Sequence, residues 1–452
     1  MSANEFAPRW AYRLVLLAAL AGMIRLNWPG HFSVDSVLAL HEGRFGLRET
    51  WNPAIFGWLL GSLDRIQPGA ALAVVLNGIL LFGSWMLLPT LRARTHWLGA
   101  VLALGVIALP QVLVYPAIVW KDVMFAVAAV AGFVVLALSV QSQSAPGRWF
   151  GLILSALLFA IAGLLRQNGL ILALPAALAL AWATSVPGWA RAVRRGFGWL
   201  ASVAVLALIL SIVAQPQGVG APDGAGAKGI RLLQSYDLAA AAALQPGRAM
   251  PNIDRAAPSV GTYLRDHADR VYSPERVDTM TADPWLAKHL PSVSRATIQA
   301  DWFGLITGDP GLYLRGRWLA FQQVFATPAI DRCLPVHVGI TGPAKALSDL
   351  KMARRADAHD GRIYNYVTWF LDTPAMSHLT FGGLAIGVFM LLMVRRDPAD
   401  LIMASLMVGA LGFAASFFVI SIACDYRYLY VLDLAALTGV LYLAIDPRLR
   451  RT

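Results

Sequence analysis

Charged residues are scarce in this chain of 452 residues: 14% are Asp, Glu, Lys or Arg, and 58% are hydrophobic. A water-soluble domain carries about a quarter charged residues, so the composition excludes an ordinary soluble enzyme. Cysteine is scarcer still, with only Cys333 and Cys424. Two cysteines exclude a disulfide-dense scaffold and a cysteine-based metal site. Both are expected on the outer side of the cell membrane. The sequence leaves open whether they form a disulfide or stay as two free thiols.

What the chain does have is long apolar segments. They cover 11–28, 70–90, 97–119, 123–140, 149–165, 169–186, 199–215, 379–394, 401–423 and 428–445. Since a membrane span needs roughly 20 apolar residues, we predict an all-α polytopic membrane protein of about ten transmembrane helices. The segment 52–66 is too short to span and ends in Asp64-Arg65. We predict that it forms an amphipathic helix on the outer surface.

The net charge of +11 is distributed unevenly along the chain. Many of the arginines lie in the termini and in alternate short loops: Arg9, Arg13, Arg92, Arg94, Arg148, Arg191, Arg194, Arg195, Arg395, Arg396, Arg448, Arg450 and Arg451. By the positive-inside rule, this placement marks a cytoplasmic face and not a nucleic-acid surface. We therefore expect a multi-pass protein of the cell (inner) membrane with both termini in the cytoplasm.

Composition also divides the chain. We predict a transmembrane block over 1–215 with its candidate catalytic residues in outer loops, an extracytoplasmic soluble domain over 216–376, and C-terminal transmembrane helices over 377–452. The middle region opens with a Gly-Pro-rich stretch and then mixes polar and apolar residues. Asp309-Pro310 is a helix-start signal within it, so we expect this domain to be mainly helical.

Ionisable residues follow several apolar segments on the predicted outer side. They are Asp35, Lys121-Asp122, Arg166-Gln167-Asn168 and Asp425-Tyr426-Arg427, and Arg25 ends the first segment. Cations at outer turns run against the positive-inside bias, and a bound phosphate would account for them. Snorkelling or pairing with a nearby Asp is the competing interpretation.

Asp35 admits two interpretations. It is either a solvated or helix-capping carboxylate, or a general base whose pKa is raised by apolar neighbours. His41 and Glu42 follow within two helical turns and either support an acceptor or metal, or form a simple polar loop face.

Four short motifs carry a resemblance to a known family. They are Trp51-Asn52-Pro53-Ala54, Trp120-Lys121-Asp122, Leu165-Arg166-Gln167-Asn168-Gly169 and Arg427-Tyr428-Leu429-Tyr430. In their order and common side, they resemble segments of the GT-C superfamily of integral-membrane glycosyltransferases, which includes aminoarabinose transferases and protein O-mannosyltransferases. The chain departs from that family in two places: Asp35 is followed by Ser36 where paired acids are usual, and Asn52 stands where His is usual.

The resemblance implies an inverting glycosyltransferase that moves a sugar from a polyprenyl-phosphate donor to an acceptor hydroxyl on the extracytoplasmic face. The acceptor would be a lipid, glycan or protein of the cell envelope. Asp35 would be the base, and Lys121, Arg166 and Arg427 would hold the donor phosphate. The supporting residues would be Asp122, Arg25, His41, Glu42, Asn168 and Asp425. No metal ligands are assigned, and a divalent cation stays open as a cofactor.

Two other function classes remain as alternatives. A transporter or lipid flippase often shows paired halves and charges near the bilayer midplane, and the sequence shows neither. A non-catalytic assembly partner for lipid-linked surface glycans would use the same lipid but would not need Asp35.

Overall fold

The computed structural model describes residues 3–50, 52–185, 188–215 and 225–448. Trp51 of the first motif, Arg450, Arg451 and the Gly-Pro-rich residues 216–224 lie outside these ranges. Contacts divide the chain into unit 1 (residues 1–219, 336–414 and 429–452) and unit 2 (residues 220–335 and 415–428). Residues 336–376, which the sequence places in the soluble region, cluster with unit 1, while 220–335 form most of unit 2.

The membrane-protein fold class is confirmed: eight helices in the described ranges are long and apolar enough to cross a membrane. They are Phe6–Asn27, Ala71–Leu91, Lys121–Gln141, Ala145–Leu165, Trp189–Val213, His378–Arg395, Pro398–Ile420 and Tyr426–Ile445. Each overlaps one of the predicted apolar segments. No regular strand is present in the part of the chain that the structure describes, where extended segments meet only as isolated bridges.

Two predicted spans differ from a straight long helix. The segment 97–119 breaks into Trp97–Ile107 and Pro110–Ala117, whose axes are bent by 84°. Pro110 lacks a backbone N–H and forces the preceding Leu109 into an extended conformation, so the helix cannot continue. The segment 169–186 begins with a 3-10 turn, Gly169–Leu172, and its helix α10 (Ala173–Ala183) is short.

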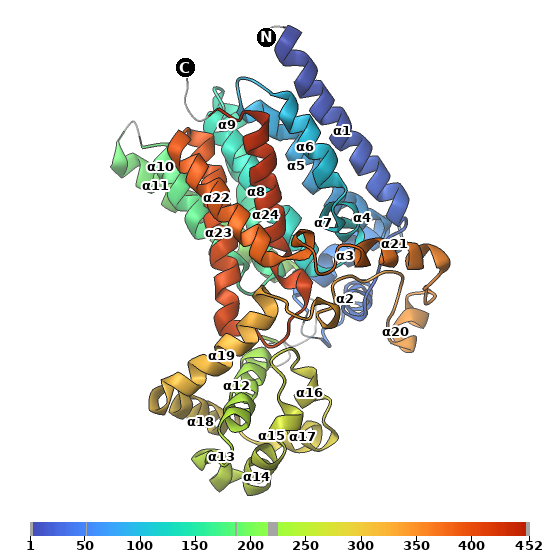
Figure 1. Cartoon of the computed structure of the whole chain (residues 1–452), viewed down its shortest axis with the longest axis vertical. Coiled ribbons are helices and arrows are strands. Elements are labelled where there is room, and N and C mark those ends of the chain that lie inside the picture. The colour runs from blue at the N-terminus through green and yellow to red at the C-terminus, as the bar shows by residue number, and fades with distance from the viewer. Residues whose placement is uncertain (1–2, 51, 186–187, 216–224, 449–452) are drawn as a thin grey trace. The chain divides into compact units, whose positions relative to one another are not determined.

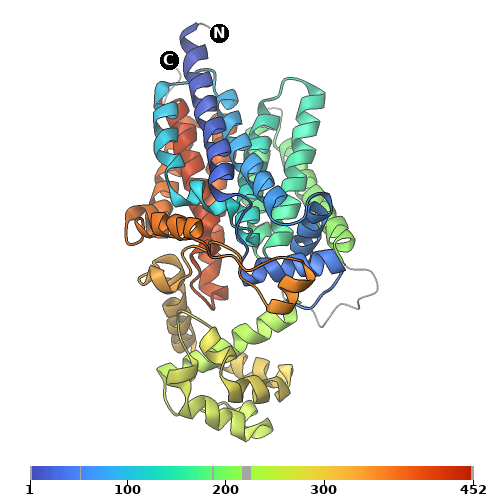
Figure 2. The ribbon, with the colours of Figure 1, turned by 90° about the vertical axis from the view of Figure 1, so that its right-hand side faces the viewer.

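Most helices of unit 1 belong to one bundle, which Figures 1 and 2 show from two sides. Its members include α1 (Ala3–Asn27), α4 (Ala71–Gly78), α5 (Ser84–Leu87), α6 (Trp97–Ile107), α7 (Pro110–Leu113), α8 (Lys121–Gln141), α9 (Ala145–Leu165), α10, α11 (Trp189–Val213), α22 (His378–Arg395), α24 (Tyr430–Ile445) and the first part of α23 (Pro398–Ile420). α8 and α24 are buried over most of their lengths. Small residues allow close packing of α8 on α9, because a Cβ on Gly151 would lie 2.7 Å from that of Ser139.

The start of α1 and the end of α24 lie at one end of unit 1 (Figure 1). Five charged side chains form a network beside the end of α24. We call Arg92, Arg395, Asp397, Asp400 and Asp446 the terminal cluster. Arg92 lies 3.1 Å from Asp397, 3.1 Å from Asp400 and 3.3 Å from Asp446, and Arg395 lies 2.8 Å from Asp400. The cluster therefore joins loops and a chain end that the sequence assigns to one side of the membrane.

The other end of unit 1 carries shorter helices: α2 (Val34–Phe45), α3 (Ala54–Ile66), α20 (Ala344–Asp349) and α21 (Ala358–Thr368). As predicted, α3 is not among the candidate spans. α2 and α3 approach closely where a Cβ on Gly43 would collide with the carbonyl oxygen of Gly57. Arg44 of α2 also donates to the buried Asp64 of α3 at 2.6 Å, so the two helices form a fixed pair.

Unit 2 is helical and has its own core. It contains α12 (Ala225–Leu244), α13 (Pro251–Ala256), α14 (Pro258–Asp266), α15 (Ala268–Val271), α16 (Asp278–Thr281), α17 (Pro284–His289), α18 (Arg295–Gly308), α19 (Pro310–Phe325) and the end of α23. Buried Arg317 contacts Asp237 and donates to the carbonyls of Val419 and Ser421 at 2.9 and 3.0 Å. Cys333 and Cys424 form a disulfide, so the paired alternative is the one observed.

Candidate functional site

The start of α2 is fixed beside the start of α8 by short extended segments. The His31 amide donates to Ala117 at 3.0 Å, and the Val119 amide donates back to His31 at 3.0 Å. The Trp120 indole donates to Ser33 Oγ at 3.0 Å. Ser33 and Ser36 lie within hydrogen-bond distance of each other, and Ser36 donates to the Val119 carbonyl.

Asp35 and Lys121 therefore occupy neighbouring helix starts. Asp35 is in the first turn of α2, and Lys121 is the first residue of α8. Both side chains are half-buried. Their segments are held together by hydrogen bonds between backbone groups and serines, so this placement does not depend on the charges themselves.

Asp122 joins the end of α9 to this region. Its carboxylate pairs with Arg166 at 2.6 Å, and its side chain is 2% exposed. The Arg166 guanidinium also lies 5.9 Å from the centre of the Phe413 ring. Asn168, half-buried, precedes the 3-10 turn Gly169–Leu172. The structure thus brings Lys121, Asp122, Arg166 and Asn168 to the same end of unit 1 as Asp35.

Two other predicted site residues belong to unit 2, and a third lies in the last turn of α1. Arg427 and Asp425 belong to unit 2, where they pair with each other at 3.0 Å. A site shared by Arg427 and Lys121 stays a prediction. Arg25 is exposed in the last turn of α1 and lines a separate hollow of about 510 Å³ with Ala21, Ile24 and Trp28.

A buried histidine that sequence reasoning did not single out connects this end of unit 1. His31 is 1% exposed, and its Nδ1 accepts the Gly339 amide at 3.0 Å. Nε2 lies 3.2 Å from the Asn27 side-chain oxygen. Burial, and then the Arg355 guanidinium, lower the pKa of His31 to about 4, against a smaller opposing effect of Asp360. His31 is therefore neutral at pH 7, with Nδ1 as the acceptor and Nε2 as the donor.

His31 could not have been identified from local sequence. Gly339 lies 308 residues away, and Arg355 lies 324 residues away. The same region includes His337, which contacts the Phe32 carbonyl at 2.9 Å, and His359, which contacts the Leu26 carbonyl at 2.7 Å. Only the folded chain brings these segments together.

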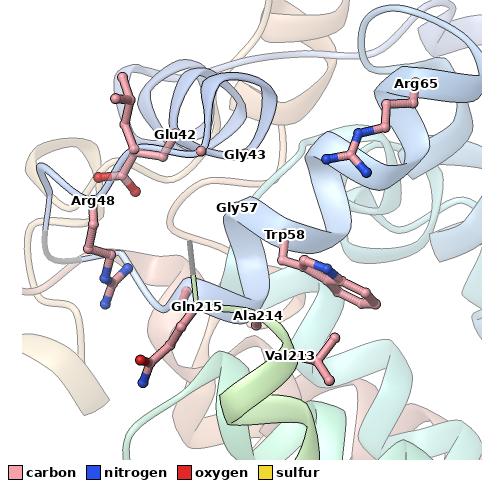
Figure 3. Close-up of a pocket in the computed structure, with 12 residues that line it drawn as sticks. Glu42, Gly43, Arg48, Gly57, Trp58, Arg65, Val213, Ala214 and Gln215 are labelled. Carbon is pink, nitrogen blue, oxygen red and sulfur yellow. The ribbon is translucent and has the colours of Figure 1, made fainter. Parts of the chain in front are cut away.

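A hollow of about 270 Å³ borders α3 (Figure 3). We call it the α3 hollow. Trp58 and Arg65 of α3 line it, together with Arg48 and, from the end of α11, Val213 and Gln215. Two guanidinium groups thus border a hollow at the end of a candidate membrane span.

The loop beside the α3 hollow is held by Glu42 and Asn52. Glu42 is buried and also lines the hollow, and its carboxylate accepts the amides of Glu49 at 2.8 Å and Thr50 at 2.5 Å. Asn52 is buried and donates to the Asp35 carbonyl at 3.1 Å. Arg48 donates to the Asn52 carbonyl. Asn52 therefore supports the backbone of α2 at Asp35.

His41 lines a second hollow, of about 580 Å³, between α2 and α20. We call it the α2–α20 groove. His41 contacts Asp349 at 3.0 Å across it. Within the ranges that the structure describes, no group of three or more His, Cys, Asp or Glu side chains is arranged to hold a metal ion.

No family model matches the chain. No curated protein matches it either. Among solved structures, the chain is similar to the archaeal oligosaccharyltransferase AglB from Archaeoglobus fulgidus, in complex with an inhibitory peptide and a dolichol-phosphate. The TM-score is 0.40 at 13% identity, over 96% of this chain and 50% of the AglB chain. This chain thus spans about half the length of AglB.

Proposed function

We propose that this protein is a membrane glycosyltransferase that moves a sugar from a polyprenyl-phosphate donor to an acceptor hydroxyl on the extracytoplasmic face. One observation supports the proposal above the others. A carboxylate, Asp35, and the cations Lys121 and Arg166 come from three separate helix ends, which hydrogen bonds and an ion pair hold at one end of unit 1.

In the proposed reaction, Asp35 takes the proton of the acceptor hydroxyl. The acceptor oxygen attacks the anomeric carbon of the donor sugar from the side opposite the phosphate. The bond from that carbon to the phosphate oxygen breaks, and its electron pair stays on the leaving phosphate. The configuration at the carbon is inverted, and a positioned base supplies roughly 10²–10⁴-fold of the rate.

The proposed roles of the cations concern the leaving phosphate. Lys121 and Arg166 stabilise its growing charge. Each charge-assisted hydrogen bond is worth roughly 1.5–3 kcal/mol. Asp122 orients the Arg166 guanidinium, a role that the 2.6 Å contact supports.

The α3 hollow is the candidate place for the lipid next to the donor phosphate. Trp58 and Val213 offer apolar contacts, and Val213 ends a candidate span, so a lipid chain could reach the hollow from the bilayer. Arg48 and Arg65 add positive charge at its border. These features favour an anionic lipid over an uncharged one.

Two features support an extracytoplasmic site. The terminal cluster collects arginine-rich loops at the end of unit 1 opposite α2, as expected for a cytoplasmic face. The disulfide between Cys333 and Cys424 favours an oxidising compartment for unit 2.

The decisive experiment incubates the purified protein in lipid nanodiscs with a panel of polyprenyl-phosphate sugars and measures release of polyprenyl phosphate. Asp35→Asn should lower the rate by roughly 10²–10⁴-fold. Its stability should change by only about 0.3–1 kcal/mol, because the amide is isosteric and the main loss is a negative charge at the start of α2. Asp278→Asn is the matched control, since Asp278 also lies in the first turn of a helix, in unit 2.

Wild-type activity in Asp35→Asn would remove Asp35 from the mechanism. If the wild type transferred no sugar from any donor but moved labelled lipid between leaflets, the transporter alternative would replace this proposal. If the protein showed neither activity and co-purified with a glycan polymerase, the assembly-partner alternative would be favoured.

A further inference from the structure

The α2–α20 groove has no role in the reaction proposed above. Its lining includes Leu38, His41 and Phe45 of α2, Glu49 of the following loop, and Lys345 and Asp349 of α20. At about 580 Å³, it is large enough for a small molecule or for the end of a polymer.

The two helices that form the groove are tied together at two points. His41 contacts Asp349 at 3.0 Å, and Arg44 donates to the Leu350 carbonyl at 2.8 Å. Arg44 is in turn paired with Asp64 of α3. The groove is therefore pre-formed, so a ligand would not bear the cost of ordering it.

The side chains in the groove suit a sugar. The Phe45 ring is 48% exposed, and the His41 ring lies 4.9 Å from it. Such an aromatic surface can pack against the C–H face of a pyranose ring. Glu49 and Asp349 offer oxygen acceptors for sugar hydroxyls, and Lys345 offers donors.

Charge and location argue against an anionic lipid in this groove. Its lining has one lysine against two carboxylates, Glu49 and Asp349. Neither α2 nor α20 is a candidate span. The α3 hollow differs in both respects, because two arginines and the end of α11 line it. Leu47 lines both cavities, so one loop separates them.

We propose that the α2–α20 groove binds the acceptor, and that the acceptor is an uncharged, hydroxyl-rich glycan. This inference rests on the proposed function, since it supplies the second substrate of the same site. Leu38 lies one helical turn beyond Asp35, and Phe45 lies about 15 Å along α2 from Asp35, at 1.5 Å per residue. A short oligosaccharide in the groove would thus bring one hydroxyl to Asp35.

The test measures binding without any donor lipid. Uncharged trisaccharides of glucose, mannose and N-acetylglucosamine are titrated into the purified full-length protein and followed by saturation-transfer NMR. We expect at least one to bind, and Phe45→Ala to weaken its binding by about tenfold. Lys345→Ala, at an exposed position of α20, should weaken it by a smaller factor.

Two controls make the result specific to the groove. Phe303→Ala removes from unit 2 a ring of nearly the same exposure, 49% against 48% for Phe45, and should leave binding unchanged. Arg65→Gln alters only the α3 hollow and should also have no effect. If Phe45→Ala does not fold, the binding measured for Lys345→Ala decides the result.

Binding of no trisaccharide would overturn the proposal, as would binding that both Phe45→Ala and Lys345→Ala leave unchanged. The proposal would also be overturned if vesicles of anionic phospholipid, or a peptide, bound the same residues more tightly than the trisaccharides do. Because the assay needs no turnover, an active Asp35→Asn variant would reject the catalytic proposal without affecting this measurement.

Discussion

The two ends of unit 1 both gather charged side chains, but they pair them differently. In the terminal cluster, Arg92 faces three carboxylates and Arg395 shares one of them, Asp400, which has no exposed surface. At the α2 end, Arg48, Arg65, Lys345 and Glu49 border hollows. One end is a closed network, whereas the other combines ion pairs such as Arg166–Asp122 with charged side chains that border hollows.

This difference separates structural charge from candidate functional charge. A buried ion network satisfies its own hydrogen bonds and has little capacity left for a ligand. Charged groups around a pre-formed hollow can contact a substrate. Charge alone would not distinguish them, because both ends of unit 1 hold arginines and aspartates from distant parts of the sequence.

The largest effect on stability should come from a substitution in the terminal cluster. Asp400→Asn weakens contacts to Arg92 and Arg395 and to the Tyr442 hydroxyl, which donates to it at 2.8 Å. Breaking a buried network in this way costs about 3–5 kcal/mol. We expect a much lower unfolding temperature in detergent, with unchanged transfer per folded molecule. A folded but inactive Asp400→Asn protein would abolish the proposed contrast between the ends.

A smaller effect, mainly on rate, is expected for Asp122→Asn. Loss of the carboxylate leaves Arg166 free to shift, and a misplacement of about 1 Å in a catalytic site can cost about 10²-fold in rate. The transfer rate is measured as release of polyprenyl phosphate. Asp254→Asn is the matched control, because Asp254 pairs with Arg265 at the same 2.6 Å in unit 2. Equal rates in the two variants would show that Asp122 does not position Arg166.

The smallest effect should be a dependence of stability on pH at the α2 end. The pKa of His31 is about 4 in the folded protein and about 6.5 when unfolded, so its contribution is complete above pH 6.5 and falls as the pH drops toward 4. The expected loss is about 2 kcal/mol by pH 5. Thermal unfolding between pH 7 and pH 5 measures it. His31→Gln should reduce this loss, and an unchanged pH dependence would assign the acid sensitivity to other groups.

Hydropathy predicted the membrane fold well because apolar length is a local property of the chain. Every predicted segment has a helical counterpart, and the main deviations follow local signals such as Pro110. The 3-10 turn at Gly169 and the disulfide state of Cys333 were not predictable in this way. The disulfide joins residues 91 apart in sequence, and hydropathy does not report on such a pairing.

The candidate site was only partly predictable. Outer cations that break the positive-inside bias led to Lys121 and Arg166, and both lie at the same end of unit 1 as Asp35. The bond from Asn52 to the Asp35 carbonyl was not predictable, because it joins residues 17 apart in sequence through the packing of a loop on α2. His31, Arg355 and the α2–α20 groove depend on segments about 300 residues apart in sequence, which local patterns do not reveal.

The link between Cys333 and Cys424 has a practical consequence for anyone producing this protein. Synthesis in a reducing extract, or purification in dithiothreitol, would leave residues 415–428 attached to the remainder of unit 2 by non-covalent contacts alone. Preparations for assay should therefore be made by export through the secretory route, and their thiol content should be titrated before any variant is judged inactive.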